Sequence, residues 1–385
     1  MRWIRWSPSR WRMPPACRSC KQIFAPFIVF FKNAPHRRRN IIHNEKEIAT
    51  MKKGSFSILK RTLCVLLCLV TLCCFGCTDQ ETALRLEQQA AVDLNDEEAM
   101  LPLADHRVLL TSDMHYTYLQ TWYGVTAEAR LQAWVDAILY EHSLRPFDLI
   151  VIGGDTSLDH WEHNGGGSYL KDGVTTTKAF MEKYVSQLPA DVPVFVLAGN
   201  HEQFGNAKWR EITGNDRQGS MVIGKDLYLF VDSFANELDP DYHHDGASTA
   251  PDAAFIRSEM EKHPDCNVYL ISHYFDTKKG GTEFAEIVKD PRVIALFQGH
   301  THRCNVDRLG AAYGNKKLLH TGNFSYTAHR ASVKEMRESF WGFRDIVTVG
   351  SRSVSRYIVA ESRATVEGTT LLVPRQLRHV EIFAD

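Results

Sequence analysis

The chain has 385 residues, of which 44% are hydrophobic and 24% charged, a composition that is ordinary for a globular protein. Its net charge of −1 averages two unlike parts, because residues 1–76 hold 15 Lys and Arg against two acidic residues, which leaves −14 for residues 77–385. A body this acidic excludes a protein that coats nucleic acid, since that mode of binding needs clustered Lys and Arg. Only Cys266 and Cys304 lie beyond Cys77, so a disulfide framework is excluded as well.

Residues 1–50 are rich in Arg, Trp and Pro and show neither helical nor strand periodicity. They would also place the signal described next in the middle of the chain. We therefore interpret residues 1–50 as an upstream extension that arises from a misassigned gene start, and we expect translation to begin at Met51.

Residues 51–77 are typical of an export signal. A basic stretch precedes an apolar run of about 14 residues, 62–75. This run is shorter than the about 20 residues that span a bilayer, but it suits a signal sequence. Gly76 and Cys77 end the run, and polar residues follow at once. The arrangement resembles a lipoprotein signal, in which the Cys becomes lipidated, although Cys74 stands where that family usually has Leu.

The resemblance to a lipoprotein signal implies an exported protein that a lipid on Cys77 anchors to the cell membrane, facing outward. Two alternatives remain open: a cleaved signal peptide, which would give a secreted protein, and an N-terminal membrane anchor.

The remainder of the chain divides into a short acidic segment and one long domain. Residues 78–104 are acidic and rich in Gln and Ala, which predicts a solvated tether. From His106 short apolar runs alternate with amphipathic segments, the pattern of a layered α/β domain. We predict a single domain over residues 105–385, because the chain past Lys334 has no linker and its β-rich runs are typical of closing strands.

The predicted elements follow from hydrophobic periodicity and turn residues. The predicted strands are Val108–Ser112, Asp148–Gly153, Val192–Ala198, Leu227–Asp232, Asn267–Ser272, Val293–Gln298, Lys317–Thr321, Phe343–Val349, Arg356–Ala360, Thr369–Val373 and His379–Phe383. The predicted helices are Ala127–His142, Thr176–Gln187, Pro251–His263 and Glu283–Lys289.

Five polar clusters stand where predicted strands end. They are Asp113-Met114-His115, Gly154-Asp155, Gly199-Asn200-His201-Glu202, Ser272-His273 and Gly299-His300-Thr301-His302. Because the carboxyl ends of strands in an α/β sheet form one shared crevice, we expect these clusters to converge. Carboxylate, amide and imidazole groups are ligands of divalent transition metals, and two such ions need about seven or eight donors. The clusters therefore predict a metal centre.

Each of these residues also has a structural interpretation. Asp113 could cap a helix, Asn200 could form a turn, and His273 and His300 could be core histidines. Their joint occurrence at strand ends favours the metal centre.

In chain order the clusters give DxH, GD, GNHE, a lone His and GHTH, and on these motifs the chain resembles the calcineurin-like metallophosphoesterases over residues 106–330. The resemblance implies an α/β fold, a four-layer α/β/β/α sandwich with two mixed β-sheets. It implies a first divalent metal ion held by Asp113, His115, Asp155 and His302, and a second held by Asp155, Asn200, His273 and His300. A bridging role for Asp155 agrees with its chemistry, because a carboxylate can span two cations. Mn, Fe and Zn all suit such donors.

The same resemblance implies a hydrolase of phosphomonoesters or phosphodiesters, with a metal-bridged hydroxide as nucleophile. His201 would be the acid that protonates the leaving group. Some family members orient this His with an Asp three residues after the bridging Asp. Leu158 stands there in this chain, so Asp159 or Glu202 would have to orient His201. Leu158 also argues against the Fe(III)–tyrosinate pair of the purple acid phosphatase branch, which has a Tyr at that place.

Two other functions compete with the enzyme. A surface protein could keep the metal ions and hold a phosphorylated ligand with little turnover, but it would not need His201 as an acid. A purely structural surface protein would not explain so many ligand-type residues at strand ends. We therefore expect a phosphate ester as the substrate and the membrane as a partner through the lipid anchor.

Overall fold

The computed structural model describes residues 80–117, 121–122, 124–158, 173–202, 205–234, 246–325, 340–360, 362–366 and 369–384. All of them belong to the second of two units into which the chain divides, Thr78–Asp385. The predicted upstream extension (1–50) and export signal (51–77) therefore lie outside the described residues. Across the described ranges, no helix has both the length and the apolar character needed to cross a bilayer.

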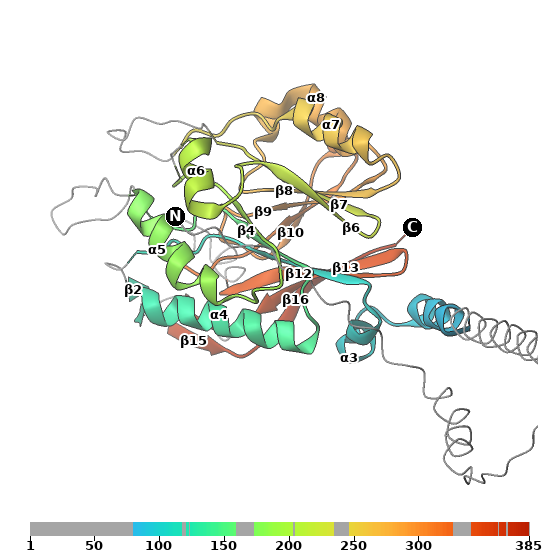
Figure 1. Ribbon diagram of the computed structural model, residues 1–385, viewed down its shortest axis with the longest axis horizontal. Helices are drawn as coiled ribbons and strands as arrows, with labels where there is room; N and C mark the ends of the chain where they lie inside the picture. The colour runs from blue at the N-terminus through green and yellow to red at the C-terminus, as the bar shows by residue number, and fades with distance from the viewer. Residues whose placement is uncertain are drawn as a thin grey trace, which may run out of the picture. The chain divides into compact units, whose positions relative to one another are not determined.

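Strands and short helices alternate along the chain (Figure 1). The strands are β1 (His106–Thr111), β2 (Thr121–Trp122), β3 (Val125–Thr126), β4 (Leu149–Gly153), β5 (Val194–Leu197), β6 (Gly219–Ile223), β7 (Asp226–Val231), β8 (Asn267–Ser272), β9 (Val293–Gln298), β10 (Val306–Arg308), β11 (Lys317–His320), β12 (Gly342–Val349), β13 (Arg352–Val359), β14 (Ser362–Val366), β15 (Thr369–Val373) and β16 (Gln376–Phe383). The α-helices are α3 (Glu97–Met100), α4 (Ala127–Leu144), α5 (Gly173–Lys183), α6 (Asn206–Thr213), α7 (Ala253–Lys262) and α8 (Thr277–Lys289). Residues 80–91 are also helical.

Two six-stranded sheets form the middle of the domain, and both are mixed. The first has the order β16-β13-β12-β1-β4-β5, in which β1, β4 and β5 are parallel and β12, β13 and β16 join in antiparallel. The second has the order β10-β11-β9-β8-β7-β6, with four parallel strands between two antiparallel edge strands. Helices α4 and α5 cover the outer face of the first sheet, and α7 and α8 cover that of the second (Figure 1). The predicted four-layer sandwich is confirmed.

Alternating side chains of the central strands fill the three spaces between the layers. In β1, Leu109 packs with helix α4, whereas Val108 and Leu110 pack against the second sheet. This alternation follows from the two-residue period of a strand. All six residues of β1 are buried, as expected for a strand covered on both faces.

Every predicted strand and helix is present, and β8, β9 and β15 have the predicted bounds. The elements that the sequence did not predict include β6, β10 and α6. These are short elements at or beyond the edges of the sheets, where few side chains are buried; in α6 only Trp209 is. A weak apolar pattern gives little signal of periodicity.

The acidic segment before β1 is more ordered than the predicted tether. Leu94, Met100 and Leu101 are buried in a cluster with Val347 and Val354 of the first sheet. The structure describes residues 80–104 of this segment. The prediction of a solvated tether is wrong for residues 94–104, because their apolar side chains are buried against the domain. The few apolar residues of this acidic segment give no recognisable pattern in the sequence. The folded domain therefore begins before residue 105.

A buried network of charges holds the closing strands in place. Asp345 of β12 accepts hydrogen bonds from Arg107 Nε at 2.8 Å and from Arg356 Nη2 at 2.5 Å, and all three side chains are buried. Arg107 also pairs with Glu141 of α4 at 2.8 Å, and Arg356 with Glu97 of α3 at 2.9 Å. One carboxylate thus ties β1 and β13 to the strand between them.

Removing this carboxylate should be costly, because it leaves two buried guanidinium groups without their shared partner. We expect Asp345→Ala to lower the free energy of unfolding by about 3–5 kcal/mol. Asp216 is the matched control, since it pairs with Arg210 at the surface. Asp216→Ala should cost less than about 1 kcal/mol. Urea unfolding of both variants measures the difference, and equal losses would contradict a structural role for the buried network.

Candidate metal centre

The five polar clusters meet at the carboxyl ends of the parallel strands, where the two sheets come together. Asp113 and His115 follow β1, Asp155 follows β4, and Asn200 and His201 follow β5. The second sheet contributes the side chains that follow β8 and β9, which are His273, His300 and His302. The structure thus brings together all seven predicted metal ligands and His201, from five loops and both sheets.

The first group consists of Asp113, His115 and His302. Asp113 Oδ1 lies 3.3 Å from His302 Nε2 and 3.7 Å from His115 Nε2. The two imidazole nitrogens are 3.0 Å apart. Three donor atoms therefore face one point, and all three side chains are buried.

The second group consists of Asp155, Asn200, His273 and His300. Asn200 Oδ1 lies 3.1 Å from His273 Nε2 and 2.8 Å from His300 Nδ1. Asp155 Oδ2 lies 3.2 Å from His273 Nε2. These four donor atoms surround a second point.

One oxygen belongs to both groups. Asp155 Oδ2 is 3.6 Å from His115 Nε2 of the first group and 3.2 Å from His273 Nε2 of the second. His201 Nε2 lies 3.9 Å from the same oxygen, and the backbone N–H of His201 donates to the other oxygen, Oδ1, at 3.1 Å. Asp155 is therefore the centre of the whole arrangement.

The chemistry of this donor set fits divalent metal ions. The Nδ1–H of His273 donates to Gly153 O at 2.7 Å, which directs Nε2 at the site as the nitrogen that would bind a metal ion. Burial lowers the pKa of both His115 and His300 to about 3, so these imidazoles are in the neutral form that binds metals.

The pKa shifts of Asp155 and His273 couple metal binding to pH. Burial raises the pKa of Asp155 to about 7. Burial lowers the pKa of His273, but the Asp155 carboxylate more than offsets this, and the net effect is a rise to about 9. A metal ion that enters between them has to displace such protons, which makes binding favourable at higher pH.

Unusual backbone geometry is concentrated in the ligand loops. Asp113, His115, Asp155, His300 and His302 all have positive φ, between 42° and 65°. Side chains with a Cβ rarely adopt this region, and each instance costs of order 1–3 kcal/mol. The loops are therefore held in a strained form that directs the donor atoms inward.

Gly199 of the GNHE motif is required for space. A Cβ at this position would lie 2.1 Å from Asp155 Oδ1 and 2.6 Å from the Asp155 backbone nitrogen. No side chain fits there, so glycine allows the β5 loop to approach the central carboxylate.

Glu202 links the loop after β4, which contains Asp155, to the loop after β5, which contains Gly199. Its buried carboxylate accepts from the backbone N–H groups of Asp155, Thr156 and Ser157 at 2.7–3.3 Å, and from that of Gly199 at 2.7 Å. Both oxygens are thereby engaged with backbone. The suggestion that Glu202 orients His201 is wrong, and the other candidate, Asp159, lies outside the described residues.

Arg130 holds the loop after β1, which carries Asp113 and His115, and the sequence did not predict this role. This buried side chain of α4 donates through Nη1 to Met114 O at 2.6 Å and to Phe324 O, and through Nη2 to His115 O at 3.4 Å. Its guanidinium lies 4.6 Å from the centre of the Trp122 ring. In the sequence, nothing distinguishes Arg130 from a basic residue on a helix surface.

Loss of Arg130 should weaken the first group of ligands. We expect Arg130→Met to lower metal affinity by about 10–100-fold, the usual cost of losing a residue that orients ligands. Arg130→Lys should recover part of this loss because it keeps one donor. Arg356→Met is the control, since Arg356 is equally buried but lies in the charge network of the closing strands. Metal titration of the three variants would contradict the role of Arg130 if Arg356→Met lost as much affinity.

Several solved structures are similar to this chain, with 9–12% identity and TM-scores below 0.5. One solved structure similar to this chain is that of PhoD, with 9% identity, a TM-score of 0.48, and coverage of 72% of this chain and 69% of that one. Another is vacuolar protein sorting 29 from Cryptosporidium parvum, with 12% identity, a TM-score of 0.35, and coverage of 73% and 98%. A predicted phosphoesterase from Streptococcus pneumoniae TIGR4 has 9% identity, a TM-score of 0.31, and coverage of 71% and 98%. No curated protein matches the chain in sequence.

The family comparison is specific. The model of the calcineurin-like phosphoesterases matches residues 106–304, which is more than half of the chain and includes every ligand-type residue of the two groups. With the clusters of Asp and His side chains, this match supports a metal-dependent phosphoesterase. The chain belongs to the calcineurin-like phosphoesterase family.

Proposed function

We propose that this protein hydrolyses phosphomonoesters or phosphodiesters outside the cytoplasm, with two divalent metal ions in one centre. The observation that carries the number of ions is the position of Asp155, whose Oδ2 faces both groups of donors at 3.6 and 3.2 Å. Asp113, His115, His302 and Asp155 would hold the first ion, and Asp155, Asn200, His273 and His300 the second. The mixture of nitrogen and oxygen donors suits Mn, Fe or Zn.

The ions, when bound, would activate the attacking water and neutralise charge on the phosphoryl group. His201 lies beside His115 and Asp155 and is buried, with its ring edge-on to that of His115 at 4.9 Å between centroids. Its backbone N–H is fixed on Asp155. We assign to His201 the transfer of a proton from its imidazole to the departing alkoxide.

Leu158 supports an ordinary divalent pair. It is buried, at 4% exposure, three residues after Asp155, where the purple acid phosphatase branch has its Tyr ligand. No phenolate can come from this position, which favours two divalent ions over a pair that contains Fe(III).

The alternative is a surface protein that retains the metal ions but holds a phosphorylated ligand with little turnover. Such a protein would need the ligands of the two groups but not a proton donor. The presence of His201 beside the centre favours turnover.

The exchange His201→Asn separates the two functions. The variant should keep its metal ions and its fold, and lose about 10²–10⁴-fold of the rate on an alkyl phosphate ester, because the alkoxide departs without a proton. A nitrophenyl ester, whose phenolate leaves without help, should lose much less. Rates on both esters at one pH with saturating metal give the comparison.

Equal losses on the two esters would mean that His201 acts on the phosphoryl charge instead of the leaving group. The absence of turnover in the wild-type protein with every metal would favour the binding protein.

We also propose that the protein is exported and anchored through a lipid on Cys77. The support is the sequence of residues 51–77 alone. A chain that starts at Met51 should associate with membranes and become labelled by a radioactive fatty acid. Cys77→Ser should abolish the label and release the protein or leave it unprocessed, whereas Cys74→Ser is the control and should not. Labelling of the Cys77→Ser protein would exclude this anchor.

A further inference from the structure

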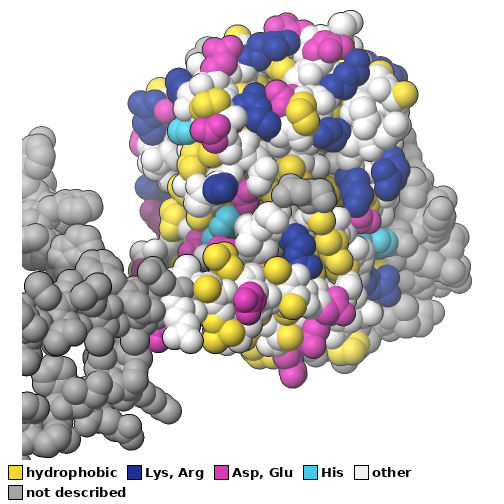
Figure 2. Space-filling model, turned by 90° about the vertical axis from the view of Figure 1, so that its right-hand side faces the viewer, with side chains coloured by type: hydrophobic (Ala, Val, Ile, Leu, Met, Phe, Trp, Pro, Cys, Tyr) yellow, Lys and Arg dark blue, Asp and Glu magenta, His cyan; other side chains and the backbone are white. Residues whose placement is uncertain are grey.

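The end of the domain opposite the metal centre has an apolar surface that the proposed chemistry does not use. This base end comprises the amino ends of β1, β4, β7 and β8 and the turns that join β6 to β7 and β12 to β13. Figure 2 shows this side of the molecule, with hydrophobic side chains among charges of both signs.

Among the described residues, the large hydrophobic side chains that are exposed lie on elements that reach the base end, such as α4, whose last turn leads to Arg145 beside Ala104 and Asp105. They are Leu84 and Leu86 on helix 80–91, Leu139, Tyr140 and Leu144 near the end of α4, Val222 beside the β6–β7 turn, and Ile382 near the end of β16. Leu84, Leu86 and Tyr140 are more than half exposed, at 54–57%. These side chains are available to contact another apolar surface at this end of the domain.

Several contacts fix helix 80–91 at the base end. Gln89 donates through Nε2 to Leu103 O at 2.9 Å and to Asp105 Oδ1 at 2.8 Å, directly before β1. Arg352 of β13 donates to Gln89 O at 2.5 Å. Leu86 follows Cys77, the proposed site of the lipid, by nine residues in the sequence.

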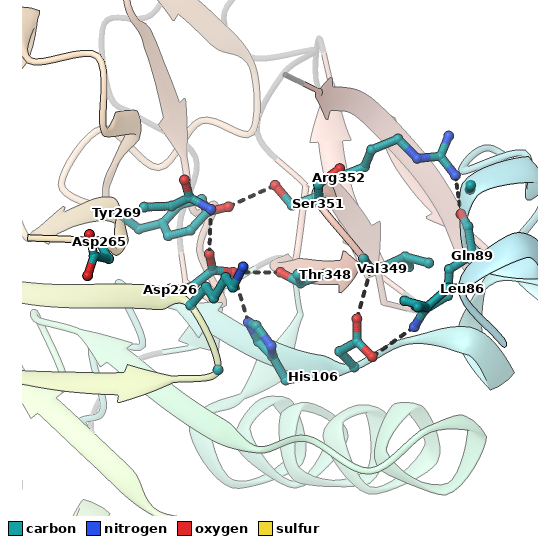
Figure 3. Close-up of a pocket in the computed structure, with 17 residues that line it drawn as sticks. Leu86, Gln89, His106, Asp226, Asp265, Tyr269, Thr348, Val349, Ser351 and Arg352 are labelled. Carbon is teal, nitrogen blue, oxygen red and sulfur yellow. Dashed lines mark hydrogen bonds and ion pairs between the residues drawn. The ribbon is translucent and has the colours of Figure 1, made fainter. Parts of the chain in front are cut away.

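A cavity of about 760 Å³ opens within this surface, between the two sheets and helix 80–91 (Figure 3). His106 lines it, is 4% exposed, and through Nε2 pairs with Asp226 Oδ2 at 3.0 Å. Within the described part of the chain, its Nδ1 has no partner. Nε2 also lies 2.9 Å from Tyr228 Oη, so the printed contacts of the ring are all at Nε2 and Nδ1 is left for a ligand in the cavity.

The rim of the cavity carries both signs of charge. Lys225 and Asp265 are exposed there, and neither side chain has a partner among the described residues. An ammonium group matches the Asp265 carboxylate, and a phosphate matches the Lys225 ammonium. A zwitterionic phospholipid headgroup carries an ammonium and a phosphate together. Its acyl chains would contact the exposed apolar side chains of the base end.

We propose that the base end rests on a bilayer of zwitterionic phospholipid, with one headgroup in the cavity and the exposed apolar side chains in the interface. Burial of apolar side chains at the headgroup boundary is the usual driving force for such contact. The metal centre then faces away from the membrane toward soluble or polymeric substrates. This inference rests on the proposed membrane anchor.

Fluorescence quenching in the anchored, full-length protein tests the orientation. A probe on Leu86 would lie near the membrane whether the base end rests on it or the protein is only tethered through Cys77. We therefore place a bimane on Leu139→Cys or Val222→Cys, which are far from Cys77 in sequence. Lys208→Cys in the first turn of α6, on the side of the metal centre, is the control. Cys266→Ser removes the half-buried thiol at the base. The vesicles contain the zwitterionic phospholipids phosphatidylethanolamine and phosphatidylcholine.

We expect nitroxide-labelled phospholipid to quench the probes at 139 and 222, and aqueous iodide to quench the probe at 208. Vesicle-bound protein in which iodide quenches all three probes equally would overturn this proposal alone. Protection of positions 139 and 222 from iodide without nitroxide quenching would indicate a protein partner and overturn it too. Protein that does not sediment with the vesicles would overturn the anchor and the orientation together.

Discussion

The shared carboxylate of Asp155 is the interaction on which the rest of the site depends. A carboxylate can serve two cations, whereas an imidazole nitrogen or an amide oxygen serves one. Its position requires that β4 lie between the strands that carry the other ligands of the first sheet, with the second sheet opposite. The four-layer arrangement of strands is thus what allows one oxygen to face His115 and His273 at once.

The buried position and the backbone conformation of Asp155 both cost free energy, and neighbouring residues offset this cost. Asp155 itself has positive φ, and burial disfavours its charge. Glu202 fixes the backbone on both sides of it, and Gly199 leaves the space it needs. These backbone contacts hold Asp155 in one arrangement, which is the preorganisation that electrostatic catalysis requires.

Sequence alone predicted the parts of the molecule whose signals are local. Strands β8 and β9 are mostly apolar runs that His273 and His300 follow, so the bounds of both strands and the place of these histidines at the strand ends could be predicted directly. The structural roles of Glu202 and Arg130 could not be predicted from the sequence, because both side chains bind backbone groups that only the tertiary structure brings near. Leu94 and Met100 were missed for a related reason, since isolated apolar residues in an acidic segment show no period.

The most direct test of the account is a count of metal ions in the purified protein by elemental analysis, with the variant Asp155→Asn beside it. The wild-type protein should hold two ions per chain. The variant loses the one charge that both ions share, so it should hold one or none and have almost no activity. Two tightly held ions in Asp155→Asn, or a single ion in the wild-type protein at saturating metal, would contradict the shared carboxylate.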